Sequence, residues 1–137
     1  MQVQPTEYRF DTTTGDLDAI IDLASEPVEP GQGRRLYCRA CRNSITEEGQ
    51  RVSIDGEHVY TRSNPAGMRF CFGCFALAPG CSALGPATEQ YSWFQGCRWQ
   101  IAVCRRCGEH LGWRFRGSRA FFALILGRLV NDENRGN

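Results

Sequence analysis

Residues 93–113 read Trp93-Phe-Gln-Gly-Cys-Arg-Trp99-Gln-Ile-Ala-Val-Cys104-Arg-Arg-Cys107-Gly-Glu-His-Leu-Gly-Trp113. This stretch holds all three tryptophans of the 137-residue chain, and they flank a Cys-x-x-Cys pair. An indole needs an apolar wall and a partner for its N–H. Three indoles around such a pair therefore form either packed core or the walls of a small pocket.

A second Cys-x-x-Cys pair, Cys38-Arg-Ala-Cys41, lies upstream, and 62 residues separate Cys41 from Cys104. Each pair places two thiolates on one side of a tight loop, and four soft sulfurs in a tetrahedron suit Zn²⁺. We therefore predict a structural zinc ion bound by Cys38, Cys41, Cys104 and Cys107. Since protein atoms fill all four positions, no substrate could coordinate the ion.

The chain has eight cysteines, and the remaining four are open to two interpretations. They could form a second metal site, but the interpretation we favour is that they are buried apolar residues or free thiols. His110 could replace a cysteine as a metal ligand, although four cysteines suffice. No signal peptide is visible, which favours metal binding over disulfides and predicts a cytoplasmic protein. These four cysteines are Cys71, Cys74, Cys81 and Cys97.

Charge divides the chain into a predicted leader, a domain and a tail. Residues 1–33 carry seven acids against one arginine, a balance of −6, whereas residues 34–137 carry 15 arginines against eight acids, a balance of +7. We expect an acidic, flexible leader over 1–33, one domain over 34–130 and a tail over 131–137. The chain has no lysine, which excludes Schiff-base chemistry and a P-loop. The modest basic balance argues against a nucleic-acid partner.

Aromatic and β-branched residues recur between turn signals at short intervals, which predicts antiparallel β structure. The segment Arg119–Val130 is ambiguous between a strand and a short helix. The expected strands are Leu36–Tyr37, Arg51–Ile54, His58–Thr61, Met68–Phe75, Trp99–Val103 and Leu111–Phe115.

Three motifs occur in a specific order along the chain. They are Asn64-Pro65-Ala66-Gly67, then Ser92-Trp93-Phe94-x-Gly96-x-x-Trp99, then Cys104-x-x-Cys107-x-x-His110-x-Gly112-Trp113-x-Phe115. Over residues 34–130 the chain resembles the CULT domain, the thalidomide-binding domain of cereblon, and most closely its bacterial single-domain form. The resemblance implies a β-tent, in which two antiparallel sheets are pinned by a zinc ion on four cysteines.

The resemblance also implies a ligand site. Trp93, Trp99 and Trp113 would be three walls of a cage for cyclic imides such as thalidomide-like glutarimides, uridine-type rings or the cyclised C-terminal Asn or Gln of a protein. Backbone groups of Tyr91 and Trp93 would bond the imide, and Phe115 would form the floor. Asn64 would be a polar edge, with Pro65 and Ser92 beside the ligand. The chain departs from the family at Tyr91, where eukaryotic members have histidine, and at Ala66.

The resemblance predicts a monomeric binding module that has no catalytic residues and no membrane contact. One enzyme alternative is a methionine sulfoxide reductase, because such enzymes also use a zinc-bearing β-tent. It requires a nucleophilic cysteine beside the pocket, and Cys97 is the candidate near the tryptophans. A nucleic-acid module that uses the dispersed arginines is a further alternative.

Overall fold

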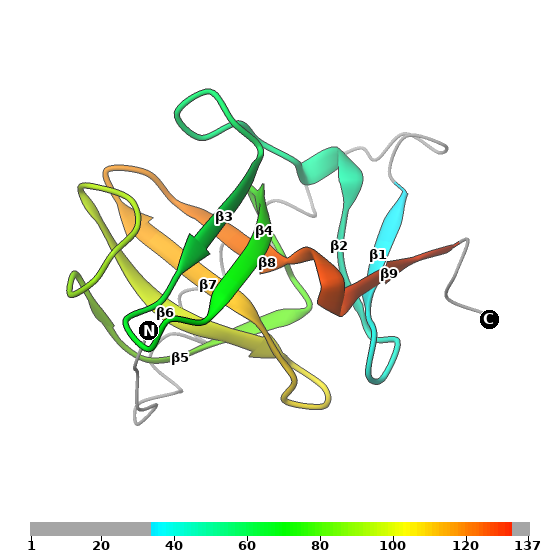
Figure 1. The fold of residues 1–137 in the computed structure, drawn as a ribbon. Coiled ribbons are helices and arrows are strands. Elements are labelled where there is room, and N and C mark those ends of the chain that lie inside the picture. The colour runs from blue at the N-terminus through cyan, green and yellow to red at the C-terminus, as the bar shows by residue number, and fades with distance from the viewer. Residues whose placement is uncertain (1–33, 133–137) are drawn as a thin grey trace.

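The computed structural model describes residues 34–132, and its strands form two antiparallel sheets (Figure 1). The smaller sheet has the order β2-β1-β9. Its strands are β1 (Arg35–Cys38), β2 (Ser44–Glu47) and β9 (Leu129–Asn131). The first strand therefore pairs with the last strand of the described region, and this pairing closes the domain.

The larger sheet has six strands in the order β3-β4-β8-β7-β6-β5, and every neighbouring pair is antiparallel. Two short 3₁₀ helices, η1 (Glu48–Gln50) and η2 (Leu126–Arg128), join the sheets. The strands are β3 (Val59–Ser63), β4 (Arg69–Phe75), β5 (Cys81–Thr88), β6 (Cys97–Cys104), β7 (His110–Gly117) and β8 (Phe121–Ile125).

Side chains alternate across the larger sheet and form a separate apolar cluster on each face. One cluster joins Leu36 and Ile45 of the smaller sheet to Ala102 and Leu124 of the larger one, so it fills the space between the sheets. The other cluster lies on the opposite face and contains most of the buried aromatic rings. The two antiparallel sheets confirm the predicted fold class.

Gly80, directly before β5, lies at a close contact with β2 of the smaller sheet. Its N–H donates to the Ile45 carbonyl at 3.0 Å. A Cβ at this position would lie only 2.1 Å from the Ser44 carbonyl oxygen. Nearby, the Thr46 hydroxyl donates to the Leu77 carbonyl at 2.6 Å. The start of β5 can therefore rest on β2 only because residue 80 has no side chain.

Most of the predicted strands are confirmed, but one prediction is wrong and two strands were missed. Residues 51–54 make only isolated bridges at Arg51 and Ile54. β2 is short and partly polar, and β5 contains Gly85 and Pro86, which are turn signals in a sequence. β5 tolerates both because it is an edge strand with a register shift. The ambiguous segment 119–130 holds β8, η2 and the start of β9.

The predicted leader, and most of the predicted tail, lie outside the described residues. Within residues 34–132, no helix is long and apolar enough to cross a membrane.

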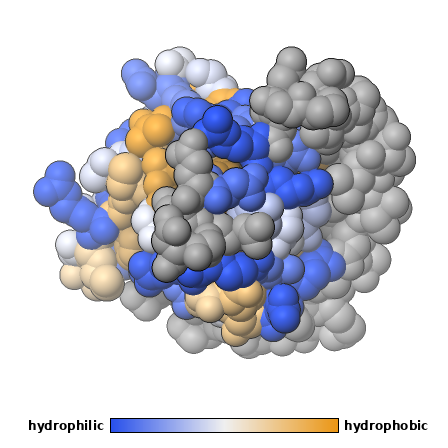
Figure 2. All heavy atoms as spheres, turned by 90° about the vertical axis from the view of Figure 1, so that its right-hand side faces the viewer, coloured by the Kyte–Doolittle hydropathy of each residue, from blue (hydrophilic) through white to orange (hydrophobic). Residues whose placement is uncertain are grey.

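Figure 2 shows the side of the molecule that carries the smaller sheet. Hydrophilic side chains dominate its coloured surface, and apolar side chains occupy smaller areas.

Candidate functional site

The four predicted metal ligands meet at the junction of the two sheets. Cys38 ends β1 and Cys104 ends β6, and the turn after each strand carries the second cysteine of the pair. The four sulfurs all lie within 4.8 Å of one another. The Cys38–Cys107 and Cys41–Cys104 sulfur pairs are each 3.6 Å apart. A tetrahedral thiolate site with metal–sulfur bonds of about 2.3 Å has edges of about 3.8 Å, so the donor set fits a structural metal ion.

The thiols of the cluster differ in pKa. Burial would raise the pKa of the Cys104 thiol, but backbone N–H groups of Cys107 and Arg106 outweigh it and lower that pKa to about 7. The Arg106 N–H lies 3.4 Å from the Cys104 sulfur. Burial raises the pKa of Cys38 to about 12, and it also raises that of Cys41. A bound dication would favour the thiolate form of all four ligands.

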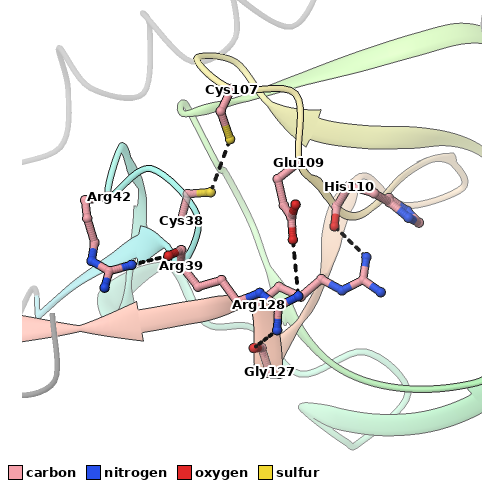
Figure 3. A network of polar contacts seen from close by, with 8 residues as sticks. All are labelled: Cys38, Arg39, Arg42, Cys107, Glu109, His110, Gly127 and Arg128. Atoms are coloured by element: carbon pink, nitrogen blue, oxygen red, sulfur yellow. Dashed lines mark hydrogen bonds and ion pairs between the residues drawn. The ribbon is translucent and has the colours of Figure 1, made fainter. Parts of the chain in front are cut away.

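A polar network holds the first cysteine turn against η2 and the start of β7 (Figure 3). Arg39 donates to the Gly127 carbonyl at 3.3 Å and to the Glu109 carboxylate at 3.4 Å. Arg128 donates to the His110 carbonyl at 2.8 Å. The metal ligands are thereby fixed to the strand that carries Trp113.

The other four cysteines do not form a metal site. Within residues 34–132, only Cys38, Cys41, Cys104 and Cys107 form a group with metal-ligand geometry. Cys74, Cys81 and Cys97 are buried and Cys71 is exposed. The interpretation of these residues as buried apolar groups or free thiols is therefore the better one.

The three tryptophans lie on one face of the larger sheet. Trp99 on β6 and Trp113 on β7 are each 1% exposed and belong to the aromatic cluster. The register pairs Trp99 with Phe115 and Ile101 with Trp113, so the two indoles are diagonal neighbours on adjacent strands. The Trp99 indole N–H donates to the Gln90 carbonyl at 2.7 Å. Both side chains are thus rigid parts of the core.

Trp93 differs from the other two because it lies in the loop between β5 and β6 and is only partly buried. Its ring meets the Trp113 ring edge to face, with centroids 4.9 Å apart. It also stacks on Phe72 at 5.4 Å. Its indole N–H donates to the Ser63 carbonyl at 3.0 Å. Trp93 is therefore the one of the three indoles that a loop carries and that is only partly buried.

The other residues of the predicted ligand site lie in the same loops or below the tryptophans. The side-chain oxygen of Asn64 accepts the Met68 N–H at 2.9 Å, and it closes the β3–β4 turn that holds the exposed Pro65. Tyr91 is 57% exposed and has a positive φ of 61°. The Ser92 hydroxyl donates to the Phe94 carbonyl at 3.0 Å. Phe115 is fully buried against Phe94 and Phe121.

Sequence comparison relates this chain to curated proteins named Protein cereblon. The chain is 30% identical over 113 residues to that of Drosophila willistoni, which covers 71% of this chain and 18% of the relative. It is 32% identical over 100 residues to that of Drosophila grimshawi, which covers 65% of this chain and 15% of the relative. No family model matches the sequence. The chain contains a cereblon-type domain. It spans less than a fifth of the length of these relatives.

Two aromatic residues of the cereblon-type domain were not predicted as part of the cluster. Phe70 meets Trp113 edge to face at 5.0 Å, and Phe72 stacks on Trp93. Both lie on β4, where alternate positions face the tryptophans. The aromatic alternation at Phe70 and Phe72 was visible in the sequence. Only the β4–β8–β7 order, which sequence periodicity does not specify, shows that these rings lie next to Trp113.

The cereblon-type domain also has a cavity of about 230 Å³ between the two sheets, away from the tryptophans. None of the predicted ligand residues lines it. Arg51 donates to His58 at 3.0 Å beside this cavity, and His58 packs edge-on against Phe75. The lining residues are Leu36, Glu48, Arg51, His58, Val59, Phe75, Leu126, Leu129 and Asn131.

Proposed function

We propose that this cereblon-type domain is a zinc-stabilised binding module whose tryptophan cluster holds a cyclic imide. The observation that carries the proposal is the contrast between two fully buried indoles on strands, Trp99 and Trp113, and one partly buried indole in a loop, Trp93. Aromatic faces around a compact ring give affinity through apolar burial, and a few polar groups fix its orientation. The relatives named Protein cereblon support the same class of site.

Ligand entry requires Trp93 to move. In the structure its ring is in van der Waals contact with Trp113, so a flat ring must separate the two indoles before it can lie between them. The movement would break the hydrogen bond from the Trp93 indole to the Ser63 carbonyl. It would leave Trp99 in place, because that indole is fixed on β6 and bonded to Gln90. The bound ring would replace the lost Trp93–Trp113 contact, because each of its two faces would lie against one indole.

The polar contacts of the ligand would come from the backbone at Tyr91 and Trp93. Tyr91 has a left-handed backbone, which is uncommon for a bulky residue and is often found at functional sites. Its side chain is exposed, so the proposed contact uses the backbone of this loop and not the tyrosine ring. An imide offers an N–H donor between two carbonyl acceptors, so one backbone C=O and one backbone N–H can bind it. Asn64, Pro65 and Ser92 would border the opening.

We propose Zn²⁺ as the metal, because four cysteine ligands favour it over harder cations. When bound, it supplies structure and no chemistry at the cage.

We propose that the site binds its ligand without catalysing a reaction. A reductase would need a reactive cysteine, whereas Cys97 is 2% exposed and the polar neighbours of its sulfur are the Ser118 hydroxyl and the Arg119 carbonyl. Cytoplasmic location and a monomeric state stay predictions of the sequence.

A titration of intrinsic tryptophan fluorescence with thalidomide and with uridine, on zinc-loaded protein, tests the proposal. We expect saturable quenching by at least one ligand, since the ring inserts beside Trp93. The matched control is thalidomide methylated at the imide nitrogen, which keeps the ring but loses the N–H donor and should not bind. An unchanged signal at millimolar ligand would refute the imide site. Equal binding of the methylated compound would refute the backbone contact.

A further inference from the structure

The cavity between the two sheets combines a charged pair with apolar walls. Glu48 and Arg51 line it together with five apolar residues. Among these, Val59 at the start of β3 is 43% exposed, and Leu126 and Leu129 are partly buried, so a small molecule in the cavity can reach their side chains. None of the three tryptophans lines the cavity, so an inference about it does not rest on the proposed function.

The Glu48–Arg51 ion pair is only loosely closed. Oε1 of Glu48 and Nη1 of Arg51 are 3.8 Å apart, which is beyond hydrogen-bond distance. Within residues 34–132, no side chain donates a hydrogen bond to the Glu48 carboxylate. The Arg51 and Glu48 side chains are 50% and 35% exposed, and ion pairs of this kind contribute little to stability. A ligand that brings its own charges can therefore replace the pair at small cost.

Arg51 is positioned by a neutral histidine. Its Nε donates to Nε2 of His58 at 3.0 Å. Because a guanidinium can only donate, this ring nitrogen accepts, and Nδ1 carries the proton that His58 donates to the Val52 carbonyl at 3.2 Å. The ring lies over Gly73, where a Cβ would be only 3.0 Å from Nε2. The bond at Nε leaves the two Nη atoms of Arg51 for a carboxylate, which accepts paired hydrogen bonds from arginine.

The size and chemistry of the cavity define its ligand. It offers one anion and one cation close together, with apolar surface beside them. The ammonium and carboxylate groups of an α-amino acid are attached to the same carbon, so they match this pair of opposite charges. An apolar cavity of about 150 Å³ binds benzene, so a volume of about 230 Å³ has room for about nine non-hydrogen atoms, the number in leucine.

We propose that this cavity is a binding site for a free α-amino acid with an aliphatic side chain of about the size of leucine. The ammonium group pairs with Glu48, and the carboxylate pairs with Arg51. The side chain contacts Val59 on the larger sheet and Leu126 and Leu129 at the junction with the smaller one. Since the ligand touches both sheets, binding also stabilises the folded domain.

A titration of zinc-loaded, ¹⁵N-labelled protein with L-leucine, followed by amide NMR, tests the proposal. We expect saturable shifts of the amides of residues 48, 51 and 59 by about 10 mM ligand, with no shift of the Trp93 or Trp99 indole N–H. The matched ligands are 4-methylpentanoate, which lacks the ammonium group, and 3-methylbutylamine, which lacks the carboxylate. Each should bind at least tenfold more weakly than leucine.

Two variants test the assigned charges. Arg51→Gln and Glu48→Gln should each weaken leucine binding at least tenfold, and the amide spectrum reports that each variant is folded. The matched controls, Arg69→Gln and Glu89→Gln, remove exposed charges outside the cavity and should bind like the wild type.

Three results in the wild type would overturn the proposal, even if a variant did not fold. The first is the absence of saturable shifts at the cavity. The second is equal binding of 4-methylpentanoate or 3-methylbutylamine, because the site would then not recognise both charges. The third is a shift of the tryptophan indoles without one at residues 48 and 59, which would place leucine in the tryptophan cluster. Wild-type affinity in a folded Arg51→Gln or Glu48→Gln variant would overturn it as well.

Discussion

Trp93 and Trp113 meet edge to face, with ring centroids 4.9 Å apart and ring planes at 81°. Trp113 is fixed on β7 by neighbours on both sides, Phe70 and His110, each of which meets it edge to face. Trp93 comes from a loop and is the less buried of the two. The contact therefore joins a buried indole on a strand to a partly buried indole in a loop, and we propose that the ligand enters here.

Truncation of Trp93 should separate binding from stability. Trp93→Ala should weaken imide binding by about 5- to 150-fold, because one aromatic contact contributes about 1–3 kcal/mol in comparable stacking sites. The fold should remain, since the side chain is only partly buried. Isothermal titration calorimetry measures the affinity, and circular dichroism checks the fold. Wild-type affinity in this variant would show that Trp93 is not a wall.

Tyr91→Ala is the matched control in the same loop. The Tyr91 side chain is 57% exposed, and the proposed contact uses only its backbone. Affinity should therefore stay within about threefold of the wild type, a difference of roughly 0.7 kcal/mol. A loss as large as that of Trp93→Ala would mean that the tyrosine ring itself contacts the ligand.

Removal of the metal should unfold the domain. Cys104→Ser, or treatment of the wild type with a chelator, should abolish the cooperative thermal transition. A structural zinc site contributes about 10–16 kcal/mol in small domains, whereas a whole domain is stable by only about 5–15 kcal/mol. Cys71→Ser is the control, because Cys71 is exposed and lies outside the cluster. It should bind one zinc per chain and melt within a few degrees of the wild type. A folded, metal-free Cys104→Ser protein would contradict this account of the site.

The sequence predicted the metal ligands better than it predicted the state of the tryptophans. Cys-x-x-Cys spacing reflects the geometry of a single tight turn, so the sequence alone predicted the cluster of Cys38, Cys41, Cys104 and Cys107. The burial of Trp99 and Trp113 depends instead on which strands neighbour β6 and β7. The segment around Trp93 is polar and contains Gly96, and of the three tryptophans only Trp93 is partly buried. β5 was missed because its edge position permits a glycine and a proline that sequence rules assign to turns.

His110 should make the domain less stable in mild acid. Burial lowers the pKa of His110, and the nearby Arg128 lowers it further, although the Gly112 carbonyl and Glu109 raise it. The folded state therefore favours the neutral ring, which donates to the Gly112 carbonyl at 3.0 Å and packs on Trp113. Because the folded pKa is below the unfolded value of 6.5, this stabilisation is present above pH 6.5 and is lost as the pH falls through the folded pKa.

A comparison with His110→Gln isolates this effect. Urea unfolding at saturating zinc should show that the free energy of unfolding falls more steeply from pH 7 to pH 5 in the wild type than in the variant. Acid release of the metal affects both proteins, so the difference between the two curves reports the histidine. Parallel curves would show that His110 has the same pKa in the folded and unfolded states.

A methyl group at residue 80 should disrupt the junction of the two sheets. In Gly80→Ala, the new Cβ would lie 2.1 Å from the Ser44 carbonyl oxygen and 2.6 Å from the Ile45 Cα, and neither backbone atom can rotate away. The Gly80 carbonyl also accepts the Arg105 N–H at 2.8 Å, so a shift of β5 would disturb the second cysteine turn. We expect the free energy of unfolding to fall by about 3 kcal/mol, the upper end of the range for overpacked cores.

Gly127→Ala is the control, since its Cβ meets no atom within 4 Å, and it should change stability by less than about 0.5 kcal/mol. Urea unfolding of the two variants at saturating zinc measures the difference. Equal midpoints would mean that the sheets can separate at Gly80 without loss, and the close approach would then not be what holds them together.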